Sequence, residues 1–334
     1  MTQQLLVNWA QAPTATLDDL IHDIRLVWAR KDAERTIYDT LLHTVNHVSK
    51  LGEQVRRGEY QGVINELGNT VMWFLTFVGK LQQPVERRLK TSREELLFYT
   101  PLTLTNIVWN KYPYTCPACF LRLTKEHKQS NAWKHKCDCI LSTGVVEERT
   151  DEEKAETEES LRIFAAEHEG EKASTLEKLE EMFAFIYQAN YETLSLEPVA
   201  FHLLEEVGEV SNAIIRLYSY NLSKTPDPAR FYLKRRLHLE SEIADVVSWI
   251  FAVSIKVKLL YQVYDKLPGV GLGPFQTPPT PRAPQISLAN ILWNQYGDRN
   301  NGLLHCPTCG KPQCDCKLRF YKTSKRTKTL LSGQ

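Results

Sequence analysis

The sequence predicts an all-α protein made of two helical bundles, each followed by a small cysteine module. Apolar residues recur at the three-to-four-residue spacing of amphipathic helices along most of the chain. The chain also repeats itself, with matching segments in the same order in both halves. Finally, all 8 cysteines fall into two sets of four. Together these observations predict a tandem duplication in which the second bundle carries the chemistry.

The internal repeat rests on six matches between the two halves. The first matches share one offset of 159 residues, so they align without gaps, and chance does not supply six matches in the same order. The pairs are Thr16–Leu20 with Thr175–Leu179, His43 with His202, Glu66–Trp73 with Glu242–Trp249, Lys80 with Lys256, Asn106–Asn110 with Asn290–Asn294, and Cys116–Cys139 with Cys306–Cys316.

The repeat and the shifts in composition divide the 334 residues into seven parts. These are a degenerate bundle at 1–85, a first cysteine module at 86–140, an acidic linker at 141–173, a catalytic bundle at 174–266, a Pro/Gly-rich linker at 267–285, a second cysteine module at 286–318 and a basic tail at 319–334.

The first half is expected to contain three main helices. After an irregular lead at 1–14, apolar spacing predicts helices at 16–31, 37–57 and 61–82, with a tight turn at Gly58–Tyr60. Pro84 should close this bundle, and residues 91–99 are expected to form a short connecting helix.

The second half is expected to begin with the acidic run VEERTDEEKAETEES, as a solvated linker or a surface helix. Leu161, Ile163 and Phe164 are predicted to dock on the second bundle. A helix capped by Ser195 follows, then a loop at 218–237 that replaces the tight turn of the first copy. The next helix is apolar almost all round from Ile243 to Leu260, which predicts burial.

Five acids on these last two helices are the candidate site. Glu206 and Glu209 share one helix face with Glu205 close by, and Glu242 shares a face with Asp245. Like charges on apolar helices repel at roughly 4 kcal/mol per close pair at an effective dielectric near 20. The cluster therefore predicts a bound cation, and all-oxygen ligands favour Mg²⁺ or Mn²⁺. The alternative is an ordinary solvated charged face.

The pattern E-E-x-x-E followed by E-x-x-D resembles the MazG-like, all-α nucleotide pyrophosphohydrolases over residues 174–265. The resemblance implies that Glu206, Glu209, Glu242 and Asp245 hold Mg²⁺ (or Mn²⁺) against a nucleoside triphosphate substrate. Glu205 would be a further ligand or would orient the attacking water. The products would be the nucleoside monophosphate and pyrophosphate. The gap between the two halves of the motif is longer than in the simplest members, which leaves the substrate class open.

The first copy lacks this acid pattern and is predicted to be catalytically inactive. Opposite the acids it carries Asn46, His47, Lys50 and Asn69, and only Glu66 remains. One carboxylate beside a lysine cannot hold Mg²⁺. Because members of the resembled family assemble as dimers, the duplication implies a built-in pseudo-dimer. Homo-oligomers through the bundles are a further expectation, and association through linkers alone is the alternative.

The loop at 218–237 is rich in cations, which a triphosphate needs beyond the metal. We expect phosphate contacts from Lys234, Arg235 and the more distant Lys256. A solvated basic loop is the alternative, and a lysine matching Lys256 in the inactive copy favours a structural role for it. Trp249 is either a base-stacking residue or part of the core. The loop cations are Lys224, Arg230, Lys234, Arg235 and Arg236.

Each set of cysteines reads C-P-x-C followed by C-D-C, which is typical of a tetrahedral structural Zn²⁺ site. Two zinc ions are therefore predicted, and a redox dithiol is the alternative. The sequence leaves open whether each module binds its own ion or pairs cross between modules. His127, His135 and His305 are expected to be bystanders. The predicted ligands are Cys116, Cys119, Cys137 and Cys139 in the first module, and Cys306, Cys309, Cys314 and Cys316 in the second.

Composition excludes few partners. A net charge of +1 gives no global field for nucleic acid or membrane, and no apolar run predicts a membrane span. The start lacks the layout of a signal peptide, so a cytoplasmic location is expected. The zinc modules and the tail KLRFYKTSKRTK could bind nucleic acid. Rival functions are therefore a nucleic-acid or nucleotide sensor without turnover, and an assembly protein.

Overall fold

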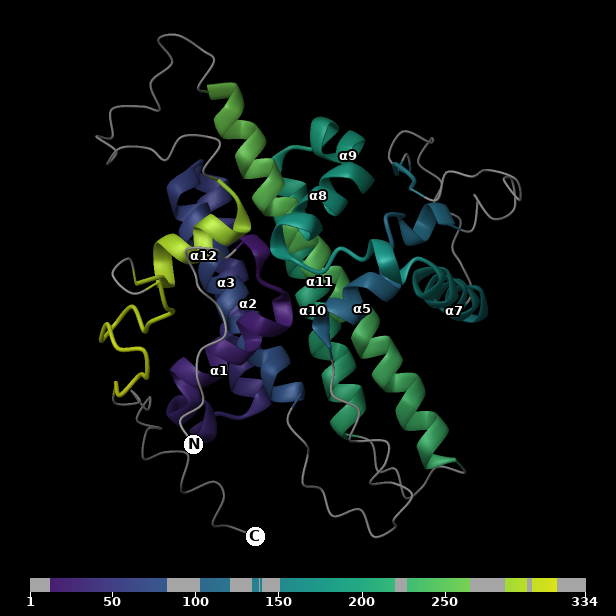
Figure 1. Ribbon diagram of the computed structural model, residues 1–334, viewed down its shortest axis with the longest axis horizontal. Coiled ribbons are helices and arrows are strands. Elements are labelled where there is room, and N and C mark those ends of the chain that lie inside the picture. The colour runs from purple at the N-terminus through teal and green to yellow at the C-terminus, as the bar shows by residue number, and fades with distance from the viewer. Residues whose placement is uncertain are drawn as a thin grey trace.

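A computed structural model describes residues 13–82, 103–120, 134–137, 139, 151–219, 227–264, 286–298 and 302–316. Within these ranges the chain is helical, with two isolated β-bridges and no strand, so the predicted all-α class is confirmed (Figure 1). In the same ranges, no helix combines the length and apolarity that crossing a membrane requires. The predicted helix at 91–99, the linker at 267–285, the tail at 319–334, Lys224 and His127 lie outside the described residues.

The first bundle consists of α1 (Leu17–Glu34), α2 (Ile37–Arg57) and α3 (Tyr60–Leu81). Thr16 and Thr36 start α1 and α2 with capping boxes, in which the threonine hydroxyl accepts from a backbone N–H three residues later. Gly58, with φ 68°, ends α2 in the left-handed conformation that glycine adopts without strain. The predicted tight turn between α2 and α3 is therefore confirmed.

The second bundle consists of α8 (Leu176–Ile186), α9 (Gln188–Thr193), α10 (Leu196–Ser219) and α11 (Pro228–Tyr264). Helices α8 and α10 begin 159 residues after α1 and α2, whereas α11 begins earlier than the position equivalent to the start of α3. Even the irregularities correspond: α1 kinks at Trp28 (φ −107°, ψ 15°), and Tyr187 (φ −108°, ψ 23°) separates α8 from α9. These two residues are related by the same 159-residue offset that the sequence repeat shows.

The predicted loop at 218–237 is wrong. Helix α10 continues to Ser219 and α11 begins at Pro228, so Lys234 and Arg235 are helical. Proline is favoured at the first helical position, and the Asp227 carboxylate accepts from the Arg230 backbone N–H at 3.0 Å, which stabilises this start. The inserted Leu, Lys and Arg residues are also good helix formers. The described part of the insertion therefore extends the start of α11.

The two bundles pack against each other along their motif helices. Helix α2 packs on α10 and α3 packs on α11. An antiparallel bridge joins Thr16 to Thr175, and the Leu176 N–H donates to the Ala15 carbonyl at 2.9 Å. The buried apolar residues of both bundles form one continuous core. Linkers are therefore not the sole connection between the halves.

Two short helices, α5 (Leu104–Lys111) and α12 (Leu288–Tyr296), each connect both bundles (Figure 1). Helix α5 begins on α1, where Asp18 accepts from the Leu104 N–H at 2.8 Å, and it packs along α11. Helix α12 begins on α8, where Glu180 accepts from the Leu288 N–H at 3.3 Å, and it packs along α3. Each helix therefore starts on the preceding bundle and ends on the other one.

Helix α7 (Asp151–Glu167), followed by a 3₁₀ turn at Glu169–Glu171, packs on α5. Its apolar side faces the first cysteine module: Leu161 is buried, and the Ala165 carbonyl accepts from Trp109 Nε1 at 2.9 Å. The predicted docking on the second bundle is wrong in two respects: α7 packs on α5 of the first cysteine module, and Ile163 is 55% exposed. Leu161 and Ala165 share a helix face that Ile163 does not, so only one side of the helix can dock.

Candidate metal centre

Three carboxylates from two helices converge at the centre of the second bundle. Glu206 and Glu209 extend from adjacent turns of α10, and Glu242 extends from the facing α11. Their nearest oxygens all lie within 4.8 Å of one another, and we call these residues the acidic cluster. Glu242 is buried, Glu206 is half-buried and Glu209 is exposed. The Oε2 atoms of Glu206 and Glu242 are buried without a hydrogen-bond partner.

Without a cation, the acidic cluster resists ionisation. Burial raises the pKa of Glu206 to about 8, and the charges of Asp245 and Glu209 add to the rise. Burial likewise raises the pKa of Glu242 to about 9, helped by a hydrogen bond with Glu209 and by Asp245. A divalent cation would favour the ionised forms and supply the missing partners. The donor set therefore fits Mg²⁺ or Mn²⁺.

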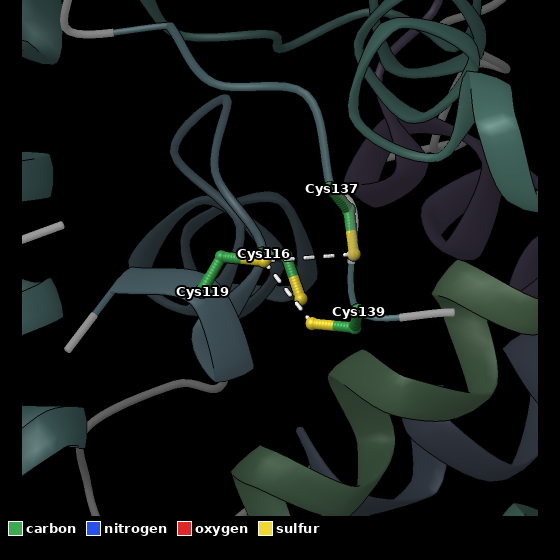
Figure 2. A group of neighbouring side chains, drawn as sticks. All are labelled: Cys116, Cys119, Cys137 and Cys139. Carbon is green, nitrogen blue, oxygen red and sulfur yellow. Dashed lines mark hydrogen bonds between the residues drawn. The ribbon is translucent and has the colours of Figure 1, made fainter. Parts of the chain in front are cut away.

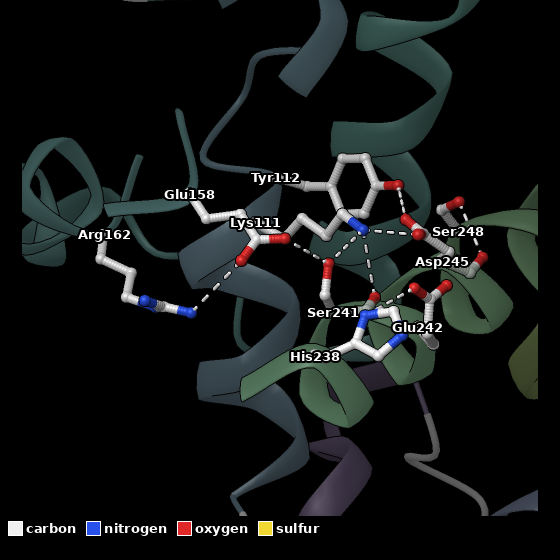
Figure 3. A network of polar contacts seen from close by, with 9 residues as sticks. All are labelled: Lys111, Tyr112, Glu158, Arg162, His238, Ser241, Glu242, Asp245 and Ser248. Carbon is white, nitrogen blue, oxygen red and sulfur yellow. Dashed lines mark hydrogen bonds and ion pairs between the residues drawn. The ribbon is translucent and has the colours of Figure 1, made fainter. Parts of the chain in front are cut away.

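Asp245 lies one turn beyond Glu242 and is held from the first cysteine module. Tyr112 Oη donates to Asp245 Oδ1, and Lys111 Nζ lies 2.5 Å from Asp245 Oδ2 (Figure 3). Asp245 is not among the three acids of the acidic cluster, although its charge acts on two of them. Its role as a metal ligand stays a prediction.

Lys111 and Tyr112 were missed by the sequence analysis, although a signal was present. The repeated N-I-x-W-N stretch continues as Lys111-Tyr112 in the first copy and as Gln295-Tyr296 in the second. In the structure Tyr296 Oη donates to Asn69 Oδ1 at 2.6 Å, the position equivalent to Asp245. The tyrosine is therefore shared, and the lysine is specific to the acidic site.

Polar contacts extend from Lys111 to the surface. Lys111 Nζ also donates to Ser241 Oγ at 2.7 Å, and this hydroxyl donates to Glu158 Oε1 of α7 at 3.0 Å (Figure 3). His238 Nδ1 lies 3.2 Å from Glu242 Oε1. Burial lowers the pKa of His238, so it contributes little positive charge at neutral pH. Lys111 is thus the main cation in the described surroundings of Asp245.

The proposed catalytic residue Glu205 is exposed and lies outside the acidic cluster. His202 Nδ1 lies 3.1 Å from its Oε2 atom. The same imidazole stacks on Trp249, with ring centroids 4.6 Å apart. The structure thus ties Glu205 to the rim of the site through His202, and its role in orienting water stays a prediction.

The three predicted phosphate-binding residues occupy different places. Lys234 and Arg235 precede Glu242 on α11, by about 10 Å or more along the helix axis. The Arg235 guanidinium lies 4.7 Å from the Phe231 ring centroid. Lys256 is buried and donates to the Tyr191 carbonyl at 2.6 Å, as Lys80 does to the equivalent carbonyl in the first bundle. Lys234, Arg235 and Lys256 therefore do not surround the acidic cluster.

An aromatic pocket opens between α9 and α11, with an empty volume of about 330 Å³, open solvent included. The Asn190 side-chain oxygen and the Tyr191 hydroxyl are both buried there without a hydrogen-bond partner. At the equivalent place in the first bundle, the Arg35 guanidinium lies 4.5 Å from the Trp73 ring centroid. The lining residues are Tyr187, Asn190, Tyr191, Leu194, Val199, Ser248 and Trp249.

The first bundle has a histidine–glutamate contact in place of the acidic cluster. His47, at the position equivalent to Glu206, places Nδ1 2.7 Å from Glu66 Oε2. The Asn69 amide lies 3.5 Å from the same oxygen. Among the described residues, none of the three potential metal-binding groups falls in this bundle. This arrangement fits the predicted loss of the cation site.

Each cysteine module gathers its own four thiols. In the first module Cys119 Sγ lies 3.7 Å from Cys137 Sγ and 3.1 Å from Cys139 Sγ (Figure 2). Tetrahedral zinc with Zn–S bonds near 2.3 Å separates its sulfurs by about 3.8 Å. Cys306 Sγ and Cys316 Sγ lie 4.0 Å apart in the second module. All eight cysteines are among the described residues and none forms a disulfide, so both donor sets fit one structural Zn²⁺ each.

The described residues answer two open points about the cysteines. Every ligand group is confined to one module, so pairs do not cross between modules. His135 and His305 are absent from both groups. Although burial by itself would raise it, the pKa of the Cys306 thiol is lowered to about 6 by backbone N–H groups of Cys309 and Thr308 and by nearby thiols. Backbone donors around a thiolate favour metal binding.

Comparison with known proteins does not assign this chain to a family. The chain matches no protein-family model, no curated protein and no solved structure. The function must therefore be argued from its own residues.

Proposed function

We propose that this protein is an Mg²⁺-dependent nucleoside triphosphate pyrophosphohydrolase. The observation that carries the proposal is the convergence of Glu206, Glu209 and Glu242 within 4.8 Å on two facing helices. Two of these acids have strongly raised pKa values, which marks a site built for a cation. The order of the acids along the chain is that of the MazG-like enzymes.

The bound cation would polarise the α-phosphate and neutralise the departing pyrophosphate. The acidic cluster would hold the cation, and Asp245, one turn further along α11, would add its negative charge. Glu205 orients the attacking water from the rim, where His202 holds its carboxylate. Lys111 provides a positive charge beside the acids.

The aromatic pocket supports a nucleotide as the substrate. Its rings offer a flat base a stacking surface, and two buried polar atoms, Asn190 Oδ1 and Tyr191 Oη, lack partners that a base could provide. In the first bundle Arg35 lies over Trp73, whereas Leu194 occupies the equivalent position in the second. The aromatic pocket is thus open in the second bundle, which carries the acidic cluster. At the equivalent place in the first bundle, Arg35 covers the Trp73 ring.

We further propose that the chain is a MazG-like tandem duplication that forms a pseudo-dimer. The recurrence of helix starts, of the break at Trp28 and Tyr187, and of the crossing helices α5 and α12 supports this idea. The first bundle serves as a wall for the second, and two structural Zn²⁺ ions stabilise the modules. Without metal, segments this short have little core of their own.

The test is pyrophosphate release from a panel of ribo- and deoxynucleoside triphosphates with Mg²⁺. Glu242→Gln is expected to abolish most of the activity, because it removes the charge of the buried carboxylate in the acidic cluster. Glu66→Gln, the equivalent change in the first bundle, is the matched control and should retain activity. The base preference within the panel would define the occupant of the aromatic pocket.

Two results would count against this function. One is the absence of pyrophosphate release from every nucleotide by folded, zinc-loaded protein. The other is equal loss of activity in Glu242→Gln and Glu66→Gln, because the acidic cluster would then have no special role.

A further inference from the structure

The first cysteine module stands directly beside the acidic site of the other bundle. Tyr112 ends α5, and Cys116 follows it by four residues. The Tyr112 ring packs edge-on against Phe183 of α8, with centroids 5.4 Å apart, while its hydroxyl donates to Asp245. The same short segment therefore carries a contact to the site and a cysteine of the first thiol cluster.

A strained turn separates these two functions. Tyr114, between Tyr112 and Cys116, has φ 54°, a left-handed backbone conformation that costs free energy in a residue with a side chain. Its carbonyl accepts from the His135 N–H at 3.0 Å, in the second arm of the module. Such a turn persists only where its surroundings hold it, so the two arms of the module must stay together.

The second arm is anchored to the bundle that contains the acids. The Cys137 N–H donates to the Ile186 carbonyl at the end of α8. A zinc ion joining Cys116 and Cys119 to Cys137 and Cys139 would therefore fix the Tyr112 segment to α8. Lys111 and Tyr112 would then meet Asp245 in one geometry (Figure 3).

We propose that zinc in the first cysteine module positions Lys111 and Tyr112 on Asp245, so that zinc loading sets the divalent-cation affinity of the acidic cluster in the other bundle. Lys111 and Tyr112 are positioning residues in this proposal. The idea rests on the proposed function for the identity of the site, but the coupling itself can be measured without turnover.

The chain contains its own control for this coupling. The second module makes the equivalent contacts on the first bundle: the Cys314 N–H donates to the Val27 carbonyl, and Tyr296 Oη donates to Asn69. Zinc in the second module would hold Tyr296 against Asn69 in the first bundle, which lacks the acidic cluster. Loss of either zinc removes a comparable module, but within the described ranges only the first module contacts Asp245.

The experiment compares Cys139→Ser with Cys316→Ser in the full-length chain, after zinc content has been measured. Mn²⁺ affinity is followed by electron paramagnetic resonance, and hydrogen exchange is followed in an α11 peptide spanning 241–248. Cys139→Ser should weaken Mn²⁺ binding about 10- to 100-fold, the usual effect of losing groups that orient metal ligands, and should raise exchange in the peptide. Cys316→Ser should leave Mn²⁺ affinity at its wild-type value and raise exchange in α3.

A second pair of variants keeps both zinc sites intact. Tyr112→Phe removes only the hydroxyl on Asp245 and should weaken Mn²⁺ binding about 10-fold. Tyr296→Phe removes the equivalent hydroxyl on Asn69 and should have no effect on it. If Cys139→Ser fails to fold, this pair decides the question.

Equal Mn²⁺ affinity in wild type, Cys139→Ser and Tyr112→Phe would overturn the coupling, as would equal effects of the first- and second-module variants. These outcomes are distinct from failure of the enzyme proposal. Wild-type protein that binds Mn²⁺ in a zinc-dependent manner without releasing pyrophosphate would retain the coupling and lose the reaction.

Discussion

At the scale of single residues, one position distinguishes the two bundles most clearly. Glu206 faces Glu242 across α10 and α11, whereas His47 faces Glu66 across α2 and α3. The two glutamates repel each other when ionised and favour a cation, whereas His47 and Glu66 are close enough to hydrogen-bond to each other and need none. The two bundles pack in the same way here, and the side chain at the position of Glu206 or His47 decides whether a cation site is present.

Stability of the metal-free protein should fall as pH rises from about 4.5 to about 9. The pKa values of Glu206 and Glu242 are raised to about 8 and about 9, so between the unfolded and folded pKa values the folded state binds more protons than the unfolded state. The free energy of unfolding should decrease by a few kcal/mol over this range, as measured by urea denaturation.

Mn²⁺ or Mg²⁺ should reverse this trend, because the cation requires the ionised acids. The gain in melting temperature on adding Mn²⁺ should be larger at pH 9 than at pH 6. The double variant Glu206→Gln/Glu242→Gln should remove both the pH slope and the Mn²⁺ response. A slope that persists in this variant would place its origin elsewhere.

At the scale of elements, helix ends fix how the bundles turn. Gly58→Ala should destabilise the protein by about 1–2 kcal/mol, because alanine is strained at φ 68°. Gly52→Ala, inside α2, should be neutral or stabilise by up to about 1 kcal/mol, because an added Cβ there meets no atom within 4 Å. Chemical denaturation of both variants checks the opposite signs, and equal effects would contradict this account of the turn.

Helix α7 depends on one buried donor of the first module. Trp109→Phe removes the indole donor and leaves the Ala165 carbonyl with the His168 N–H at 3.3 Å, so it should cost about 1 kcal/mol. Hydrogen exchange in α7 should rise more than in α2, which lies in another part of the molecule. Unchanged protection of α7 would mean that its contacts with α5 hold it without this bond.

At the scale of the whole molecule, the crossing of α5 and α12 links the two bundles. Each helix begins on one bundle and ends on the other, and one apolar core runs through both. We therefore expect a single cooperative unfolding transition in calorimetry. A zinc chelator should lower its midpoint, because both modules contribute anchoring contacts. Two resolved transitions in the zinc-loaded protein would contradict this expectation.

Much of the candidate site could be predicted from the sequence because its residues share helices. The spacing of Glu206 and Glu209 places them on one face wherever α10 packs, and the C-P-x-C pairs impose their own tight turn. The lengthened start of α11 was harder to predict, because a basic insertion reads equally well as a solvated loop. Which side of α7 is exposed was also hard to predict, because this depends on the element against which the helix packs.

The sequence by itself determined the all-α class, the main helices of the two bundles, the degenerate acids and the two four-thiol sets, because periodicity and short-range spacing govern these features. Only the tertiary structure decided that α5 reaches across to the other bundle and sets Lys111 and Tyr112 on Asp245. Residues more than 130 positions apart met there because buried faces had to pair in space. The spacing of residues along the chain does not predict against which bundle a connecting helix packs.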